Sequence, residues 1–395
     1  MRKLFAKDST RALVASLLSI LIGLAVGALI VLIVGLAEGY PIHRIFNAVG
    51  IVFAGVFSTC KDGITSFGFN SVNFGDMLFR ATPLILTGLS VSVAFKTGLF
   101  NIGAPGQYLM GTAATLYIAL SMPTDVIPAG VVWLLAFLGG MLAGAIWGAI
   151  PGLLKSTLNI NEVLACIMTN WIAANVVTWL FDIGNLKNAE EFGKVQYIKK
   201  TVYNGVETPK MGLDKLFAGS QANGGIFVAI LIAILVYILM NKTTFGYQLK
   251  ACGANRDAAT YAGIAGKRNI VLSMAIAGSL SGAAAALYYL SGNTEFAWNT
   301  YQTLPAVGFN GIPVALLAVN NPIGVIFSGL FMSMLNVSGM QLKNLGGYNE
   351  FVTDIIIAVI VYLSSFALML KLWLAKRAKA KNELPVLPKR KGETK

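Results

Sequence analysis

Long apolar stretches without a charged side chain constrain the fold of this sequence more than any other feature. They lie at 12–37, 97–124, 126–154, 163–181, 216–241, 269–294 and 296–342. A helix needs about 20 predominantly apolar residues to cross the hydrocarbon core of a bilayer. Because lipid offers no hydrogen bonds to the backbone, such segments must be helical. The sequence therefore predicts an all-α, polytopic helical membrane protein.

The apolar stretches divide into ten expected transmembrane helices. Asn320, Asn321 and Pro322 split the longest stretch, and shorter candidates lie at 81–95 and 355–370. The ten spans are expected near 12–37, 79–97, 101–121, 127–151, 162–181, 224–241, 268–290, 302–319, 322–341 and 352–372. An even number of spans places the two termini on the same side of the membrane.

Both ends of the chain are basic, within a net charge of +13. Lys and Arg gather in 2–11 and 371–395, next to membrane spans, and positive charge marks the cytoplasmic side. We therefore predict cytoplasmic termini, a single transmembrane domain over 1–375 and a basic cytoplasmic tail over 376–395. No nucleic-acid-binding motif accompanies the basic residues, so we expect membrane lipid and not nucleic acid around them.

Two connections test this topology. Residues 45–60 are apolar, but an eleventh span would separate the two basic tails, so we expect an outward-side helix or a re-entrant piece there. The loop 183–223 is assigned to the extracellular side and carries charges of both signs. A docking surface and a merely solvated connection are both consistent with its composition.

The segment 242–267 forms the one sizeable loop on the predicted cytoplasmic side. After Cys252 and Gly253, which we expect to be flexible, the pattern indicates a short capped helix, because Asn at a helix start accepts hydrogen bonds from free backbone N–H groups. An ordinary surface helix and a docking element are both open. The residues of interest are Gly253, Asn255, Ala258, Ala259, Tyr261 and Gly263.

Polar residues and helix breakers interrupt the apolar chain at 96–111 and again at 304–324. Broken helices at membrane depth are tolerated where they line a cavity, and an amide there hydrogen-bonds a neutral polar solute. A tight turn between capped helices explains the first interruption equally well. The candidates for lining a solute path, which include two residues of the span at 162–181, are Asn101, Gln107, Asn170, Trp171 and Asn310.

Glu162 opens that same span, after Asn161. An acid near a helix N-terminus is favoured by the helix dipole, which accounts for Glu162 without a further role. A role in gating is the alternative.

Small residues recur every four positions at Gly140, Gly144, Gly148 and Gly152. In lipid such spacing lets two helix backbones approach closely, so the sequence predicts a packing seam along this span.

The sequence offers little support for a catalytic site or a metal site. The single histidine, His43, has no second histidine and no nucleophile beside it. The three cysteines, Cys60, Cys166 and Cys252, lack metal-type spacing, and a disulfide framework is not expected from them. We therefore expect neither an enzyme nor a metal site.

Four segments together resemble the permease family of ABC importers for simple sugars, nucleosides and branched-chain amino acids. In chain order they are ATPLILTGLSVSVAF with GLFNIGAPGQYLMG, then NEVLACIMTNWIA, GANRDAATYAGI and GFNGIPVALLAVNNPIG, over about residues 80–330. The NIGA-x-GQ and NEV elements look most like the nucleoside and simple-sugar branch. Pro105 stands where the family usually has an acid, so contacts made by that acid are in doubt here.

The resemblance implies a permease subunit that forms the transmembrane path for uptake of a nucleoside or simple sugar by alternating access. It implies a second permease subunit, in a hetero- or homodimer, a cytoplasmic ATP-binding subunit and an extracellular solute-binding lipoprotein or periplasmic protein. The expected location is the bacterial cell (inner) membrane. By position, the residues from Gly253 to Gly263 would couple to the ATPase.

ATP is expected on the partner, because the chain has no G-x-x-x-x-G-K-[ST] phosphate loop, and no cofactor is expected on the chain itself. The main rival is an ion-coupled secondary transporter, which usually needs ionisable groups deep in the membrane. Here the acids sit near span ends, and Asp354 is the best candidate for such a carrier.

Overall fold

The fold is a bundle of long helices with two small sheets at its edges. A computed structural model describes residues 8–61, 64–184, 186–188, 197–297, 299, 302–344 and 346–364. The longer helices are α1 (Asp8–Ala37), α3 (Ser71–Lys96), α4 (Ala104–Ser121), α5 (Ala129–Leu158), α6 (Glu162–Ile183), α8 (Gly225–Lys242), α11 (Gly266–Tyr289) and α13 (Pro322–Asn344). The shorter helices are α2 (Ile42–Ala54), α7 (Leu213–Leu216), α9 (Thr244–Ala254), α10 (Arg256–Tyr261), α12 (Ala306–Leu317) and α14 (Glu350–Ser364).

Six of the described helices are long and apolar enough to cross a membrane, namely α3, α5, α6, α8, α11 and α13. Each coincides with an expected span. The other expected spans fall on α1, α4, α12 and α14. The expectation of a polytopic helical membrane protein is therefore confirmed in this coarser form. The tail at 376–395 lies outside the described residues.

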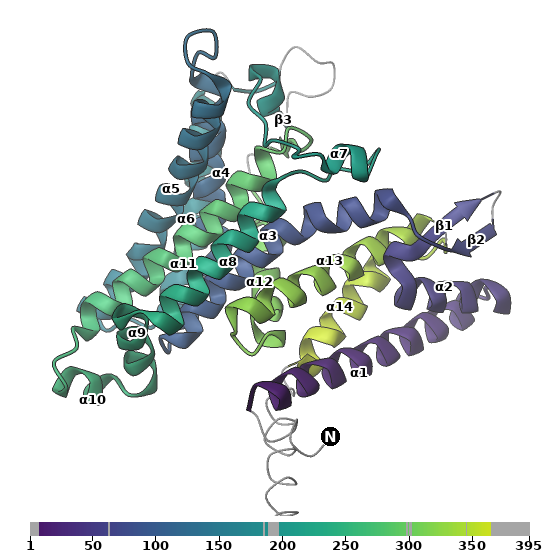
Figure 1. Ribbon diagram of the computed structural model, residues 1–395, viewed down its shortest axis with the longest axis horizontal. Coiled ribbons are helices and arrows are strands. Elements are labelled where there is room, and N and C mark those ends of the chain that lie inside the picture. Colours follow the sequence, from purple (N-terminus) through teal and green to yellow (C-terminus); the bar gives the residue numbers. More distant parts are fainter. Residues whose placement is uncertain are drawn as a thin grey trace, which may run out of the picture.

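Helix α3 is the centre of the bundle. In its most apolar stretch 83% of the residues are buried, against 28% in α5, so α3 is surrounded by protein while α5 leaves much of its surface for lipid or a partner. Helices α8, α11, α12 and α13 all pack on α3. In Figure 1, α3 lies between the group that contains α4, α5, α6, α8 and α11 and the group that contains α1, α13 and α14.

The predicted glycine seam of α5 is confirmed, and its partner is α11. A Cβ on Gly144 would collide with the carbonyl oxygen of Gly278 and lie 3.0 Å from the Cα of Gly282. Gly148 meets Met274 and Gly278 in the same way one turn later. The two backbones therefore touch, as small-residue interfaces allow.

Residues 45–60 form no membrane span in the structure. Helix α2 ends at Ala54, a 3₁₀ turn η1 (Gly55–Phe57) follows, and strand β1 (Ser58–Lys61) pairs antiparallel with β2 (Ile64–Phe67). The buried side of α2, including Ile45 and Ile51, packs toward α1 and α13. The expectation of a helix here and not a span agrees with α2, and the short antiparallel strand pair that follows Gly55 is a small addition to a predominantly helical fold.

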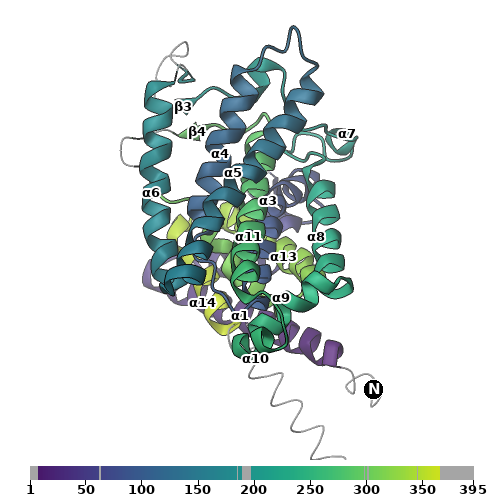
Figure 2. The ribbon, with the colours of Figure 1, turned by 90° about the vertical axis from the view of Figure 1, so that its left-hand side faces the viewer.

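The described part of the loop 183–223 is folded onto the bundle. Strand β3 (Tyr197–Ile198) pairs with β4 (Phe296–Ala297), and a 3₁₀ turn η2 (Thr201–Asn204) follows. The Asn204 side chain donates to the carbonyls of Ala119 and Met122, and the backbone N–H of Gln221 donates to Asp76. Figures 1 and 2 place β3 and α7 at one end of the bundle and α9 and α10 at the other.

Candidate functional site

Most of the loop 242–267 is helical, and its second half is the short capped helix that the sequence predicts. The Asn255 side chain accepts a hydrogen bond from the backbone N–H of Ala258 at 3.0 Å, which starts α10. The helix stops before Gly263, whose φ of +81° is in the left-handed region that favours glycine. The predicted cap, helix and stop are confirmed.

Helix α10 turns one set of side chains outward. Tyr261 is 97% exposed and Ala258 is exposed, whereas Ala259 is only 6% exposed. The contacts of α10 within the chain are with α9 and α11, and Ala259 is on that inner side. Tyr261 and Ala258 are therefore the candidate residues that a partner protein could reach.

Gly253 is an anchor and not the flexible joint expected from the sequence. It lies in the last turn of α9, and a Cβ added to it would come within 2.5 Å of the Lys96 carbonyl oxygen and 2.8 Å of the Gly98 nitrogen. The arm formed by α9 and α10 therefore contacts the backbone directly at the end of α3. Only a residue without a side chain allows so close an approach.

Beyond that contact lies the connection between α3 and α4, where Asn101 and Gln107 form a reciprocal amide pair. Asn101 Nδ2 donates to Gln107 Oε1 at 2.9 Å, and Gln107 Nε2 donates to Asn101 Oδ1 at 3.0 Å. Asn101 also donates to Ser90 and accepts from the Gly103 N–H. Both amides are buried, so in this conformation they hold the connection together and face other protein groups.

Asn170 of α6 completes this arrangement. Its Oδ1 accepts from the Gly106 N–H at 2.9 Å, and its Nδ2 donates to the Ile102 carbonyl at 3.0 Å. A Cβ on Gly106 would lie 2.9 Å from the Asn170 Cα, so α4 and α6 touch at this glycine. We call Asn101, Gln107 and Asn170 the amide clamp. The structure brings these three sequence candidates together.

The other two candidates lie elsewhere. Trp171 is 54% exposed, whereas its neighbour Asn170 is buried. Asn310 is half-buried on α12. Helix α12 itself approaches closely, because a Cβ on Gly308 would lie 2.6 Å from the Cα of Pro105. Pro105, in the first turn of α4, therefore packs against α12 at the position where the family usually has an acid.

Helices α3 and α11 are joined by polar contacts that were not predicted from the sequence. Ser281 Oγ donates to Ser90 Oγ at 2.9 Å, and Ser273 Oγ donates to Thr97 Oγ1 at 2.8 Å. The two residues of each helix are about two turns apart and therefore share a face. The sequence does contain a signal for this contact, because small hydroxyl residues recur about two turns apart in both apolar helices. Through Ser90 the contact joins the amide clamp to α11.

Glu162 lies in the first turn of α6 and is paired with Lys155. Its carboxylate is 3.0 Å from the Lys155 ammonium, and the Asn161 side chain caps the helix by accepting from the Val163 N–H. Both observations fit the helix-start interpretation of this acid. The pair also links the end of α5 to the start of α6.

Comparison with known proteins assigns the chain a family. The family model described as branched-chain amino acid transport system / permease component matches residues 73–365. That range contains all but the first two residues of α3 and continues through α14, so it includes the amide clamp and the α9–α10 arm.

Several permeases are similar to this chain over most of its length. The guanosine ABC transporter permease protein NupP of Bacillus subtilis is 33% identical over 90% of this chain and 94% of its own length. The nucleoside ABC transporter permease protein NupB of Lactococcus lactis is 33% identical over 98% of this chain and 99% of its own length. The glucose ABC transporter permease protein TsgB13 of Haloferax volcanii is 28% identical over 82% of this chain and 86% of its own length.

Proposed function

The chain belongs to the permease family of branched-chain amino acid transport systems, and from this premise we propose how it takes up a nucleoside. It is a multi-pass membrane permease subunit of an ABC importer for a nucleoside or sugar, and a transport component and not an enzyme. Membership of the family implies an ATP-binding subunit and a substrate-binding protein as partners.

A nucleoside is the proposed solute. The observation that carries this choice is the similarity to two nucleoside permeases, each at 33% identity over at least nine-tenths of this chain. The glucose permease is less similar and covers less of the chain. A sugar is the alternative solute, and the two have ring hydroxyl groups in common.

The proposed topology has ten spans with both termini in the cytoplasm. Its support is geometric: the described start of α1 lies at the end of the bundle that carries α9 and α10 (Figure 2). This end is then cytoplasmic, and the folded loop 183–223 is extracellular. We assign that loop as the docking surface for the substrate-binding protein, because its described part exposes large apolar side chains on a folded support, namely Tyr203, Met211 and Leu216.

Coupling to ATP is proposed to run through α10. In this scheme the exposed Tyr261 and Ala258 meet the ATP-binding subunit, and Gly253 passes the displacement of the arm to the end of α3. The amide clamp and the α3–α11 hydroxyl contacts then move as one unit, because each side chain in them is tied to another element. Shifting the ratio of two gate conformations from 1:99 to 99:1 requires about 5.5 kcal/mol of differential stabilisation between them. ATP binding by the partner would supply this free energy.

The remaining partners follow the same scheme. ATP is bound by the partner, because this chain has no phosphate loop. A second permease subunit completes the path. Co-purification of a tagged copy of this chain with an untagged copy, or with a different permease, distinguishes a homodimer from a heterodimer.

Uptake measurements test the solute. The assembled transporter, reconstituted with its partners and given ATP, is expected to accumulate labelled guanosine, and unlabelled nucleosides should compete while glucose should not. Accumulation of glucose that guanosine fails to inhibit would replace the nucleoside by a sugar and leave the permease assignment standing.

A further inference from the structure

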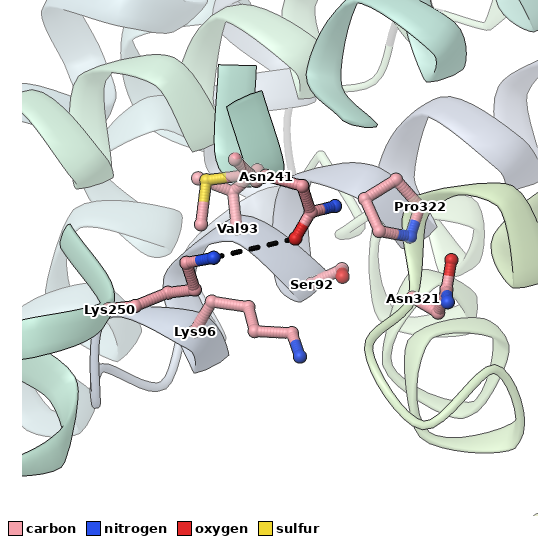
Figure 3. Close-up of a pocket in the computed structure, with 8 residues that line it drawn as sticks. Ser92, Val93, Lys96, Asn241, Lys250, Asn321 and Pro322 are labelled. Atoms are coloured by element: carbon pink, nitrogen blue, oxygen red, sulfur yellow. Dashed lines mark hydrogen bonds between the residues drawn. The ribbon is translucent and has the colours of Figure 1, made fainter. Parts of the chain in front are cut away.

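A small polar pocket opens at the end of the bundle that carries α9 and α10 (Figure 3). Its cavity volume is about 40 Å³. Its walls come from the last turn of α3, the end of α8, helix α9 and the turn between α12 and α13. None of these wall residues belongs to the amide clamp or to the outer face of α10.

The charges of the pocket suit an anion. Lys96 of α3 and Lys250 of α9 both line it, together with the neutral side chains of Ser92, Asn241 and Asn321, and none of the lining residues that the structure describes is acidic. Lys250 Nζ lies 3.4 Å from Asn241 Oδ1, so its ammonium is held over the pocket. Figure 3 shows the two lysines on one side and Asn321 with Pro322 on the other.

The start of α13 adds to this potential. The helix begins at Pro322, which lines the pocket, so its N-terminal end faces the same space. Asn321 Oδ1 accepts hydrogen bonds from the N–H groups of Ile323 and Gly324. A helix N-terminus carries about half a positive elementary charge and stabilises anions, here in addition to two lysines.

The surroundings of the pocket suit a lipid. Along α8, in the turns that lead up to Asn241, one stripe of apolar side chains is exposed: Leu231 at 56%, Leu235 at 54% and Ile238 at 44%. The stripe lies within the apolar span α8, and its last member, Ile238, is three residues before Asn241, which lines the pocket. An acyl chain lying on this stripe would place its headgroup at the lysines, as basic pockets between helices bind phospholipid headgroups.

We propose that this pocket binds the phosphate of an anionic phospholipid, with an acyl chain along the exposed stripe of α8. The bound phosphate accepts hydrogen bonds from Lys96 and Lys250 and lies at the N-terminal end of α13. Because Lys250 belongs to α9, the lipid ties the α9–α10 arm to both α3 and α13. The site is separate from solute recognition and is tested without ATP or solute.

The test measures lipid binding to the full-length chain. Phosphatidylglycerol retained after purification is measured by native mass spectrometry, and its affinity is measured by titration in nanodiscs of phosphatidylcholine. The variant Lys96→Gln/Lys250→Gln removes both charges from the pocket. The control Lys267→Gln/Arg268→Gln removes two exposed basic residues at the start of α11 that do not line the pocket.

The pocket variant is expected to bind phosphatidylglycerol at least about fivefold more weakly than the wild type, the factor that corresponds to roughly 1 kcal/mol for one lysine at an anionic lipid surface. The control should lose much less, and both should unfold at the wild-type temperature in phosphatidylcholine. Equal lipid binding by the pocket variant and the wild type, or an equal loss in the control, would overturn the proposal. Inorganic phosphate that binds the pocket while phosphatidylglycerol does not would overturn the lipid assignment.

Discussion

Gly98 and Gly253 touch through their backbones: a Cβ added to Gly98 would lie 3.0 Å from the Cα of Gly253. Gly98 lies in the connection from α3 to α4, and Gly253 lies in the last turn of α9, which leads into α10. Gly98 also has a φ of +74°, so the connection needs glycine for its conformation as well as for this contact. The proposed path from the ATP-binding partner to the gate passes through this one point.

Replacing Gly253 by alanine is expected to uncouple the transporter. The added Cβ would meet the backbone at Lys96 and Gly98, so α9 must move off the end of α3. Uptake by the assembled transporter should fall several-fold while ATP hydrolysis persists. Gly130→Ala is the matched control, because a Cβ there meets no atom within 4 Å. A Gly253→Ala transporter that retains wild-type uptake per ATP hydrolysed would contradict the proposed path.

Tyr261→Ala is expected to weaken assembly with the ATP-binding subunit and to leave the fold intact. The side chain is 97% exposed, so the chain loses almost no internal contact, while an exposed aromatic is a frequent anchor at protein interfaces. Co-purification with the ATP-binding subunit measures the loss. Tyr247→Ala removes a tyrosine that is 68% exposed on α9 and should leave co-purification unchanged. Ala259 is a poorer probe of docking, because a large residue at this buried position would disturb α10 itself.

Asn101→Ala is expected to lower thermal stability. The substitution leaves the buried Gln107 amide and the Gly103 N–H without partners, and each unsatisfied buried polar group costs about 1–3 kcal/mol. The melting temperature in detergent measures the effect. Asn175→Ala, at an exposed position on α6, is the control and should melt like the wild type. A stable Asn101→Ala protein with altered solute preference would show instead that this amide contacts the solute.

Gly144→Ala is expected to destabilise the bundle. Its Cβ would collide with the Gly278 carbonyl of α11, and neither backbone can move without separating the two helices. Gly139→Ala, five residues earlier on α5, meets only the end of the flexible Ile118 side chain and should be tolerated. Yield and melting temperature of the two variants provide the comparison. Equal stability of both would refute the seam as a tight contact.

Local signals predicted the local structure well. The cap by Asn255, the stop at Gly263 and the glycine spacing of α5 each depend on a few neighbouring residues, and each is confirmed. The start of α6 at Glu162 belongs to the same class. Such features follow from backbone hydrogen bonding and side-chain size within one or two turns of helix.

Contacts between distant segments could not be read in the same way. The sequence marked Asn101, Gln107 and Asn170 as polar residues in apolar surroundings, but not that they bond to one another or to the chain around them. It marked Gly253 as flexible, because the backbone of Gly98 that fills its open side is far away in the chain. The β-hairpin after α2 also went unpredicted, since its strands are only four residues long.

The most direct test of the central claim measures nucleoside accumulation in proteoliposomes. Vesicles that contain the chain with its ATP-binding, permease and substrate-binding partners should concentrate labelled guanosine when ATP is present on the side of the ATP-binding subunit. Vesicles with the chain alone should not concentrate it under any proton or sodium gradient. Accumulation by the chain alone, driven by an ion gradient, would contradict the account and establish an ion-coupled carrier.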